Sequence, residues 1–127
     1  MSKIVRNFQS LPERIRATLV ARSYDPSAFI LALKTAFKPS ATIPILWFVV
    51  MRDAVLICNT HRERGIWRTL KGQDTSVRIA TTSAGQPYIE LGAYGEERSV
   101  YMTLADGTEA ADMDELMREI ARARDAK

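Results

Sequence analysis

Between residues 65 and 104 apolar and polar residues alternate in several short segments, as they do in strands that bury one face. Two runs that are apolar at nearly every position, residues 45–51 and 54–59, flank the pair Arg52-Asp53 and predict two buried strands joined by a tight turn. Further strands are predicted at Gly65 to Lys71, around Val77 and Ile79, around Ile89 and Leu91, and around Val100, Met102 and Leu104.

A helical period replaces this alternation at the C-terminal end of the chain. Between Thr108 and Lys127 the acidic residues gather near the start and basic ones near the end, which matches the helix macrodipole. We therefore expect an amphipathic helix packed on the sheet. Its apolar residues recur at spacings of one, three and four and form one stripe: Met113, Leu116, Met117, Ile120 and Ala121.

Two stretches before residue 44 also carry helical signals. Asp25-Pro26 is a typical helix start, and the apolar residues that follow predict an amphipathic helix over Pro26–Phe37, which Pro39 ends. Residues 14–22 fit a helix capped by Ser10, with Glu13 at capping-box spacing, but they also alternate as a strand does. Both interpretations of residues 14–22 remain open at this point.

These elements predict an α+β fold with an N-terminal helix or helices, a six- to seven-stranded antiparallel meander, and an amphipathic C-terminal helix packed on the sheet. The seventh strand is residues 15–21 if they are extended. A chain of 127 residues suits one domain. Within it we expect residues 1–42 to form a helical extension and residues 43–127 to form the sheet with its helix.

Seven strands followed by a closing helix is the order of the pleckstrin-homology superfold. The segment Leu46 to Leu70, LWFVVMRDAVLICNTHRERGIWRTL, resembles bacterial pleckstrin-homology-like and GRAM-like modules, which join an aromatic-rich strand, a tight turn, an apolar strand and a basic connection. The resemblance extends over about residues 43–124 and implies a partly open barrel. It does not imply inositol-phosphate binding, because the interval that carries the basic motif in that family holds Lys34 and Lys38 as its cations here.

Charge divides the chain into a basic and an acidic part. Residues 1–71 carry 12 Lys and Arg against 4 Asp and Glu, a net charge of +8, whereas residues 72–127 carry 6 against 11, a net charge of −5. The two parts either attract each other within one fold or leave a basic face for an anionic partner. The overall net charge of +3 is too balanced for a strong electrostatic footprint on duplex DNA, so nucleic acid is not an expected partner.

The densest polar cluster is the segment 61–71, which combines four cations, one aromatic ring and the single histidine. Arginine can grip phosphate or carboxylate through two N–H groups, and a tryptophan ring can stack on another ring or on a guanidinium. The alternative is a solvated hairpin tip whose arginines pair with the acidic C-terminal half. We predict partner- or anion-binding residues in this hairpin at His61, Arg62, Arg64, Trp67, Arg68 and Lys71.

The chain carries no set of residues with the spacing of a catalytic centre or a cofactor site. Cys58 and His61 point to opposite faces if the strand continues, and one Cys with one His is too few for a zinc site. We expect Cys58 to pack as a small hydrophobe, and we predict no catalytic residue, metal or cofactor. Charges break the apolar window after residue 51, so neither a signal peptide nor a membrane span is expected, and the lone cysteine favours a cytoplasmic location.

The function that these features favour is a non-enzymatic binding module. A protein partner or a second copy of the chain is expected, and an anionic membrane surface is a further candidate, whereas the sequence identifies no small molecule. The alternative is a small-ligand-binding protein or enzyme with a pocket between the helix at 26–37 and the sheet. The aromatic residues that would line that pocket are Phe29, Phe37, Trp47, Phe48 and Tyr88.

Overall fold

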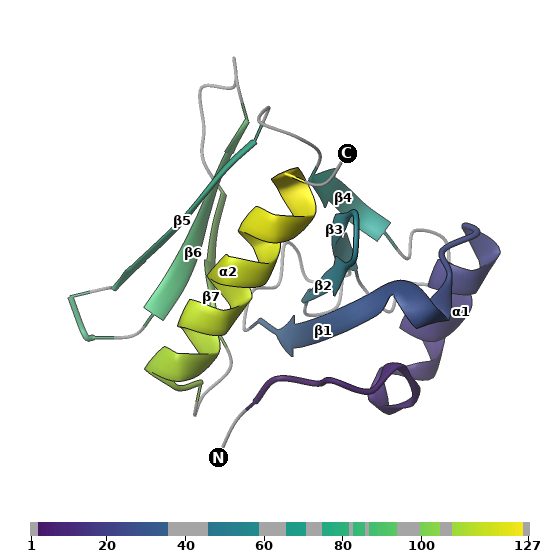
Figure 1. The fold of residues 1–127 in the computed structure, drawn as a ribbon. Coiled ribbons are helices and arrows are strands. Elements are labelled where there is room, and N and C mark those ends of the chain that lie inside the picture. The colour runs from purple at the N-terminus through teal and green to yellow at the C-terminus, as the bar shows by residue number, and fades with distance from the viewer. Residues whose placement is uncertain are drawn as a thin grey trace.

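The computed structural model describes residues 3–35, 46–58, 66–70, 75–81, 83–85, 87–93, 100–104 and 108–125. Within these ranges the backbone alone is described at 66–70, 75–77, 87, 91–93, 100–103 and 124–125. The described residues form an α+β fold with two antiparallel sheets and two α-helices, as Figure 1 shows. The predicted fold class is confirmed at this level.

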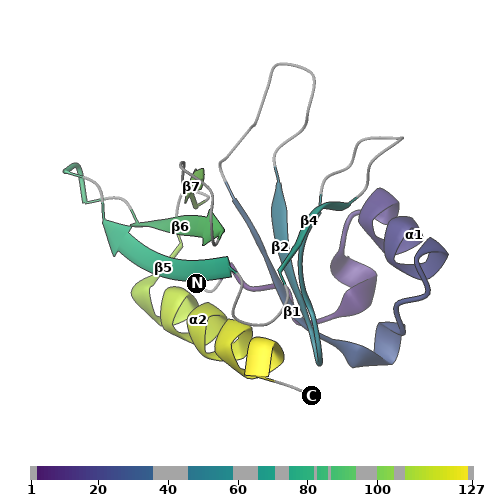
Figure 2. The ribbon, with the colours of Figure 1, turned by 90° about the horizontal axis from the view of Figure 1, so that it is seen from above.

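The first sheet lies between the two helices. Helix α1 (Glu13–Ala21) covers one of its faces, and α2 (Ala110–Asp125) crosses the other and reaches the second sheet in both views of the ribbon (Figures 1 and 2). The first sheet has the order β1 (Phe29–Lys34), β2 (Trp47–Met51), β3 (Val55–Cys58) and β4 (Ile66–Leu70). The second has the order β5 (Thr75–Thr81), β6 (Pro87–Ala93) and β7 (Val100–Thr103).

Strands β2 and β3 are apolar at every position because both faces of the first sheet are buried. Phe48 and Val50 point into a core beneath α2, whereas Val49 and Met51 point into a second core beneath α1. We call these the α2-side core and the α1-side core. The α1-side core consists of Leu11, Ile15, Leu19, Ala28, Ala32, Val49, Met51, Leu56 and Cys58.

The α2-side core joins the two sheets to the C-terminal helix. Met113, Leu116 and Ile120 of the predicted stripe are buried in it, beside Ile89 of β6 and Leu104 after β7. The predicted helix and its packing on the sheet are therefore confirmed, with bounds two residues inside the expected ones at each end. One detail was wrong: Ala121 is exposed, and the stripe continues through Ala123.

The N-terminal segment is fastened to the start of α2. The carboxylate of Asp112 is buried, and its Oδ2 accepts the backbone N–H groups of Lys3 at 2.9 Å and Glu109 at 3.3 Å. A carboxylate in the first turn also interacts favourably with the positive end of the helix dipole. Val5 adds a short antiparallel bridge to Ala32 of β1.

The predicted helix over Pro26–Phe37 is wrong. Asp25 does act as a cap, since its Oδ1 accepts the Ser27 N–H at 2.9 Å and this bond lowers the pKa of Asp25. However, the cap starts only the short 3-10 turn η2 (Pro26–Ala28), after which the chain is extended as β1. The part of the predicted helix at residues 36 and 37 lies outside the described residues.

Burial on two sides explains why this segment is a strand. Leu31 and Leu33 lie in the α2-side core and Ala32 lies in the α1-side core. Consecutive side chains point to opposite sides in this way in an extended strand and not in a helix. The register with β2 shifts between Phe29 and Leu31, so Ile30 also packs against the α2-side core. This bulge breaks the alternation and produces the spacing that resembled a helix. Within residues 3–35 the chain is therefore only partly helical, and β1 belongs to the first sheet.

The ambiguity at residues 14–22 is settled in favour of a helix. Ile15 and Leu19 of α1 are fully buried in the α1-side core, which is the i, i+4 spacing of one helical face. The predicted cap was wrong, because Pro12 occupies the N-cap position and Ser10 ends the 3-10 turn η1 (Phe8–Ser10).

The described strands form two sheets and not one closed barrel. An isolated bridge between Thr35 and Leu104 links the end of β1 to the end of β7. The hydroxyl of Thr35, which is buried, donates to the carbonyl oxygen of Leu46 at 2.7 Å. None of the helices in the described ranges is long and apolar enough to cross a membrane.

Candidate functional site

The predicted basic hairpin is described only in part. His61, Arg62, Arg64 and Lys71 lie outside the described residues, and Trp67 and Arg68 are described by their backbone in β4. β4 stands at the end of the strand order of the first sheet, opposite to β1. In the register with β3, Ile57 pairs with Arg68 and Cys58 with Ile66, so Trp67 is an extra residue at an irregularity. Bulges of this kind occur often at sheet edges.

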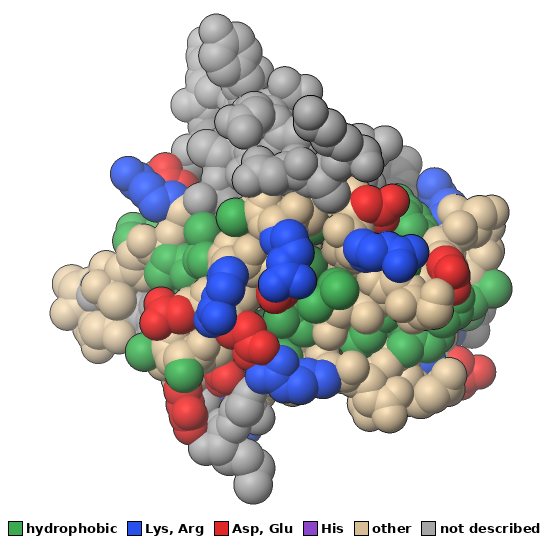
Figure 3. Space-filling model, in the orientation of Figure 1, with side chains coloured by type: hydrophobic (Ala, Val, Ile, Leu, Met, Phe, Trp, Pro, Cys, Tyr) green, Lys and Arg blue, Asp and Glu red, His purple; other side chains and the backbone are tan. Residues whose placement is uncertain are grey.

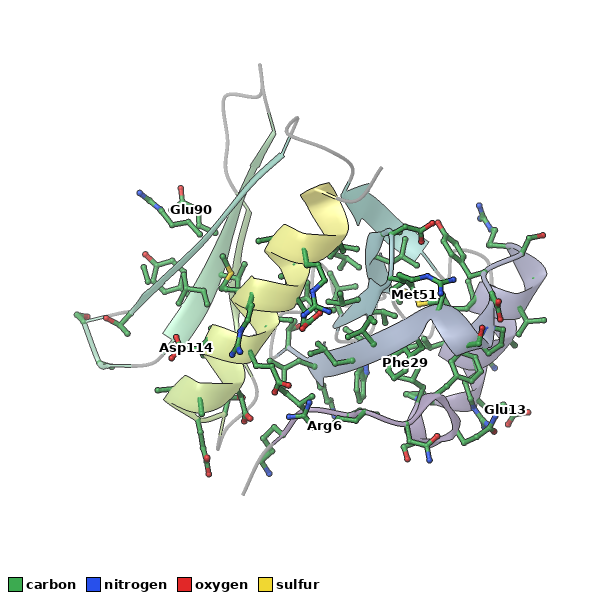
Figure 4. The ribbon with its side chains drawn as sticks, in the orientation of Figure 1. Arg6, Glu13, Phe29, Met51, Glu90 and Asp114 are labelled. Carbon is green, nitrogen blue, oxygen red and sulfur yellow. The ribbon has the colours of Figure 1, made fainter. Side chains whose placement is uncertain are left out.

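The predicted pocket between a helix at 26–37 and the sheet is wrong, because that segment contributes β1 to the sheet itself. Phe48 is fully buried in the α2-side core, whereas Phe29 and Trp47 are partly buried against the α1-side core (Figure 4 labels Phe29). Tyr88 belongs to β6 of the other sheet. The described aromatic residues of this prediction therefore do not line one space, and Phe37 lies outside the described residues.

Cys58 packs as a small hydrophobe, as predicted. It ends β3 in the α1-side core and is fully buried there. Burial raises the pKa of the Cys58 thiol to about 12, because the surrounding apolar side chains do not solvate a thiolate. Since an exposed thiol has a pKa of 9.0, the protonated thiol stabilises the fold below pH 9, and this contribution is lost as the pH rises towards 12.

We expect the native chain to react with the thiol reagent dithiobis(nitrobenzoate) at pH 8 at least about 100-fold more slowly than the chain unfolded in urea. The reason is the combination of a protonated sulfur and the cover provided by α1. The release of nitrothiobenzoate, followed by absorbance, measures both rates. A native rate within a few fold of the unfolded rate would show that Cys58 is accessible and would contradict this assignment.

A hollow of about 520 Å³ lies on the outer side of α1. Figure 4 shows Glu13 on this side of the helix, turned away from the sheet. Phe8 forms part of the lining, and its ring packs edge-on against Phe29, with ring centroids 6.0 Å apart. We call this hollow the α1 groove, and its lining residues are Phe8, Gln9, Glu13, Arg16, Ala17, Val20 and Ala21.

Arg16 is the positively charged residue in the lining of the α1 groove. Its Nη1 donates to Oε1 of Gln9 at 2.9 Å. Its Nε is buried and has no hydrogen-bond partner within the described chain. A buried N–H without an acceptor destabilises a fold by about 1–3 kcal/mol. The groove was missed in the sequence because its residues share a face only if residues 14–22 are helical.

Charged residues of opposite sign are mixed on the face that α2 presents in Figure 3. Arg6 and Glu115 form a two-pronged ion pair, which raises the pKa of Arg6 and lowers that of Glu115. The pair therefore weakens as the pH falls through the lowered pKa of Glu115. On the same helix Arg122 and Glu119 form a second ion pair, with 3.0 Å between Nη2 and Oε1. The basic and acidic parts of the sequence thus contact each other here.

Comparison of the chain with protein-family models, with curated proteins and with solved structures finds no match. Within the described ranges, no three or more His, Cys, Asp and Glu residues gather as metal ligands would. The function has to be inferred from the surface features of the chain itself.

Proposed function

We propose that this chain is a non-enzymatic interaction module on a pleckstrin-homology-like scaffold, which engages an anionic partner surface through the basic segment 61–71. An acidic protein surface is the expected partner, and an anionic membrane is the alternative that the experiment separates from it. A cytoplasmic location fits this function.

The order of the elements supports the scaffold. A four-stranded antiparallel sheet, a three-stranded antiparallel sheet and a closing amphipathic helix follow one another along the chain. The same order underlies the resemblance of Leu46 to Leu70 to pleckstrin-homology-like modules. α2 packs its apolar stripe on β1, β2 and β3, which leaves the surface as the place for recognition.

The pattern of ion pairs carries the proposal for the segment 61–71. The alternative for its arginines is pairing with the acidic C-terminal half. Three described carboxylates of that half already pair with cations elsewhere in the chain: Glu90 with Arg78, Glu115 with Arg6, and Glu119 with Arg122. Asp112 accepts backbone N–H groups. Glu115 and Glu119 are therefore paired with cations outside the segment 61–71, so these two carboxylates are not the ones that would balance it.

The placement of β4 adds to this argument. Trp67 and Arg68 belong to β4, the last strand in the order of the first sheet, and a partner that binds an end strand does not have to separate two paired strands. Arginine binds carboxylates and phosphates through two parallel hydrogen bonds, so three arginines within the seven residues 62–68 of the sequence favour an anionic surface.

The test replaces Arg62, Arg64 and Arg68 by glutamate and measures binding to poly-glutamate and to vesicles containing phosphatidylserine. We expect affinity for poly-glutamate to fall by at least about tenfold, since each cation near an anionic surface contributes on the order of 1 kcal/mol. The matched control carries the same charge change at three exposed sites, Lys34, Arg52 and Arg118. If both variants lose the same affinity for poly-glutamate, the loss comes from the change in net charge alone, which would contradict a site in the segment 61–71. If the variant loses binding to the vesicles and keeps its affinity for poly-glutamate, the partner is a membrane and not an acidic protein surface.

A further inference from the structure

We propose that the α1 groove is a second docking site, which takes an acidic protein segment carrying at least one large apolar side chain. This inference rests on described residues outside the segment 61–71 and goes beyond the function proposed for that segment. The observations behind it are a second apolar face on α1, an arginine without a carboxylate partner, and the charge of the helix.

α1 has apolar residues on two faces, although one is enough to hold it on the sheet. Ile15 and Leu19 are fully buried in the α1-side core. Ala17, Val20 and Ala21 lie on the other side and line the groove. Val20 is 57% exposed and is the exposed large hydrophobic residue of the described chain.

The groove is long and open. Its volume of about 520 Å³ faces solvent, so a partner segment would lie along α1 rather than enter an enclosed pocket. Two alanines keep the helix surface low, and the Phe8 ring, fixed against Phe29, provides an apolar wall. An open apolar groove along a helix can receive a leucine or an aromatic side chain of an amphipathic segment.

Arg16 gives the groove a polar anchor. Among the described residues no carboxylate forms an ion pair with it, and its hydrogen bond goes to the neutral side chain of Gln9. Its Nε is buried with no acceptor within the same part of the chain. A carboxylate that enters the groove and turns the guanidinium towards itself would give this fork a charged partner, which is the stronger kind of hydrogen bond.

Charge selects among the occupants. The lining of the groove carries one cation, Arg16, and one carboxylate, Glu13. Arg14 and Arg22 belong to the same segment outside the lining, so residues 13–22 as a whole carry a net charge of +2. A second copy would bring the same net positive surface and would be repelled. An acidic amphipathic segment supplies both the apolar side chain and the opposite charge.

The test selects peptides of about 16 residues from a random display library on the full-length chain and measures the affinity of the enriched sequences. We expect them to combine Asp or Glu with large apolar residues. Ala17→Glu, which places a carboxylate at an exposed position of the groove, should weaken their binding by at least about tenfold, and so should Arg16→Gln. Ala121→Glu makes the same change at an exposed position of α2 and should leave binding unchanged.

Thermal melting of each variant shows that a loss of binding is not a loss of fold. The variant with Arg62, Arg64 and Arg68 replaced should retain peptide binding, so the failure of one proposed site does not entail the failure of the other. Three results would overturn the α1 groove proposal. They are no enrichment of acidic apolar sequences, full binding by Ala17→Glu, and a wild-type dimer in sedimentation that Ala17→Glu converts to a monomer. The last result would make a second copy the occupant.

Discussion

Replacing Phe48 by alanine is expected to lower the free energy of unfolding by about 3–5 kcal/mol, the range for a fully buried phenylalanine. Phe48 is the largest side chain of the α2-side core, and in the register it pairs with Leu33 of β1 and Ile57 of β3. Its removal therefore leaves a cavity beneath α2 that three strands line. A domain of this size is stable by about 5–15 kcal/mol, so the loss is a large fraction of the total.

Urea denaturation followed by circular dichroism measures this effect. Val20→Ala is the matched control, because Val20 is 57% exposed and its substitution should change the free energy of unfolding by less than about 0.5 kcal/mol. A loss below about 1.5 kcal/mol for Phe48→Ala would mean that the core closes around the missing ring. The two sheets and α2 would then not be held together by this cluster.

The sequence predicts best those elements in which the buried positions follow one regular pattern along the chain. β2 and β3 are buried on both faces, so their runs are apolar throughout and end at the charged pair Arg52-Asp53. α2 is recognisable because a single stripe faces the core and the charges follow its dipole. In both cases the local pattern and the tertiary environment agree.

The prediction failed where a tertiary contact overrides a strong local signal. Asp25 and Pro26 are good helix-starting residues, yet pairing with β2 and burial on two sides make the following segment a strand. The bulge at Ile30 hides the alternation that would have identified it. Strand pairing between residues about 20 positions apart leaves no trace in the local pattern.

The candidate sites differ in how far a sequence can predict them. The basic segment 61–71 is a cluster along the chain and is therefore visible without a structure. The α1 groove depends on which way one helix faces, because Phe8, Arg16 and Val20 come together only when α1 is helical and η1 folds beside it. Val20 can then be recognised as an apolar residue on the side of α1 that does not pack against the sheet.

Replacing Leu19 by alanine is expected to lower the free energy of unfolding by about 2–5 kcal/mol, because Leu19 is fully buried between α1 and the first sheet. The consequence differs from that of Phe48→Ala, although the losses are similar. Leu19 helps to hold a short helix on the sheet, so its removal favours a local opening in which α1 leaves the sheet while the α2-side core stays closed.

The thiol of Cys58 distinguishes the two kinds of opening, since it lies in the α1-side core with Leu19 and on the face opposite to Phe48. Local opening exposes Cys58 without global unfolding. Leu19→Ala should therefore react with dithiobis(nitrobenzoate) faster than its global stability accounts for, whereas Phe48→Ala should react in proportion to its stability. If Leu19→Ala and Phe48→Ala react equally fast once their free energies of unfolding are taken into account, α1 opens only when the whole domain unfolds. The α1 groove would then be as stable as the sheet on which α1 packs.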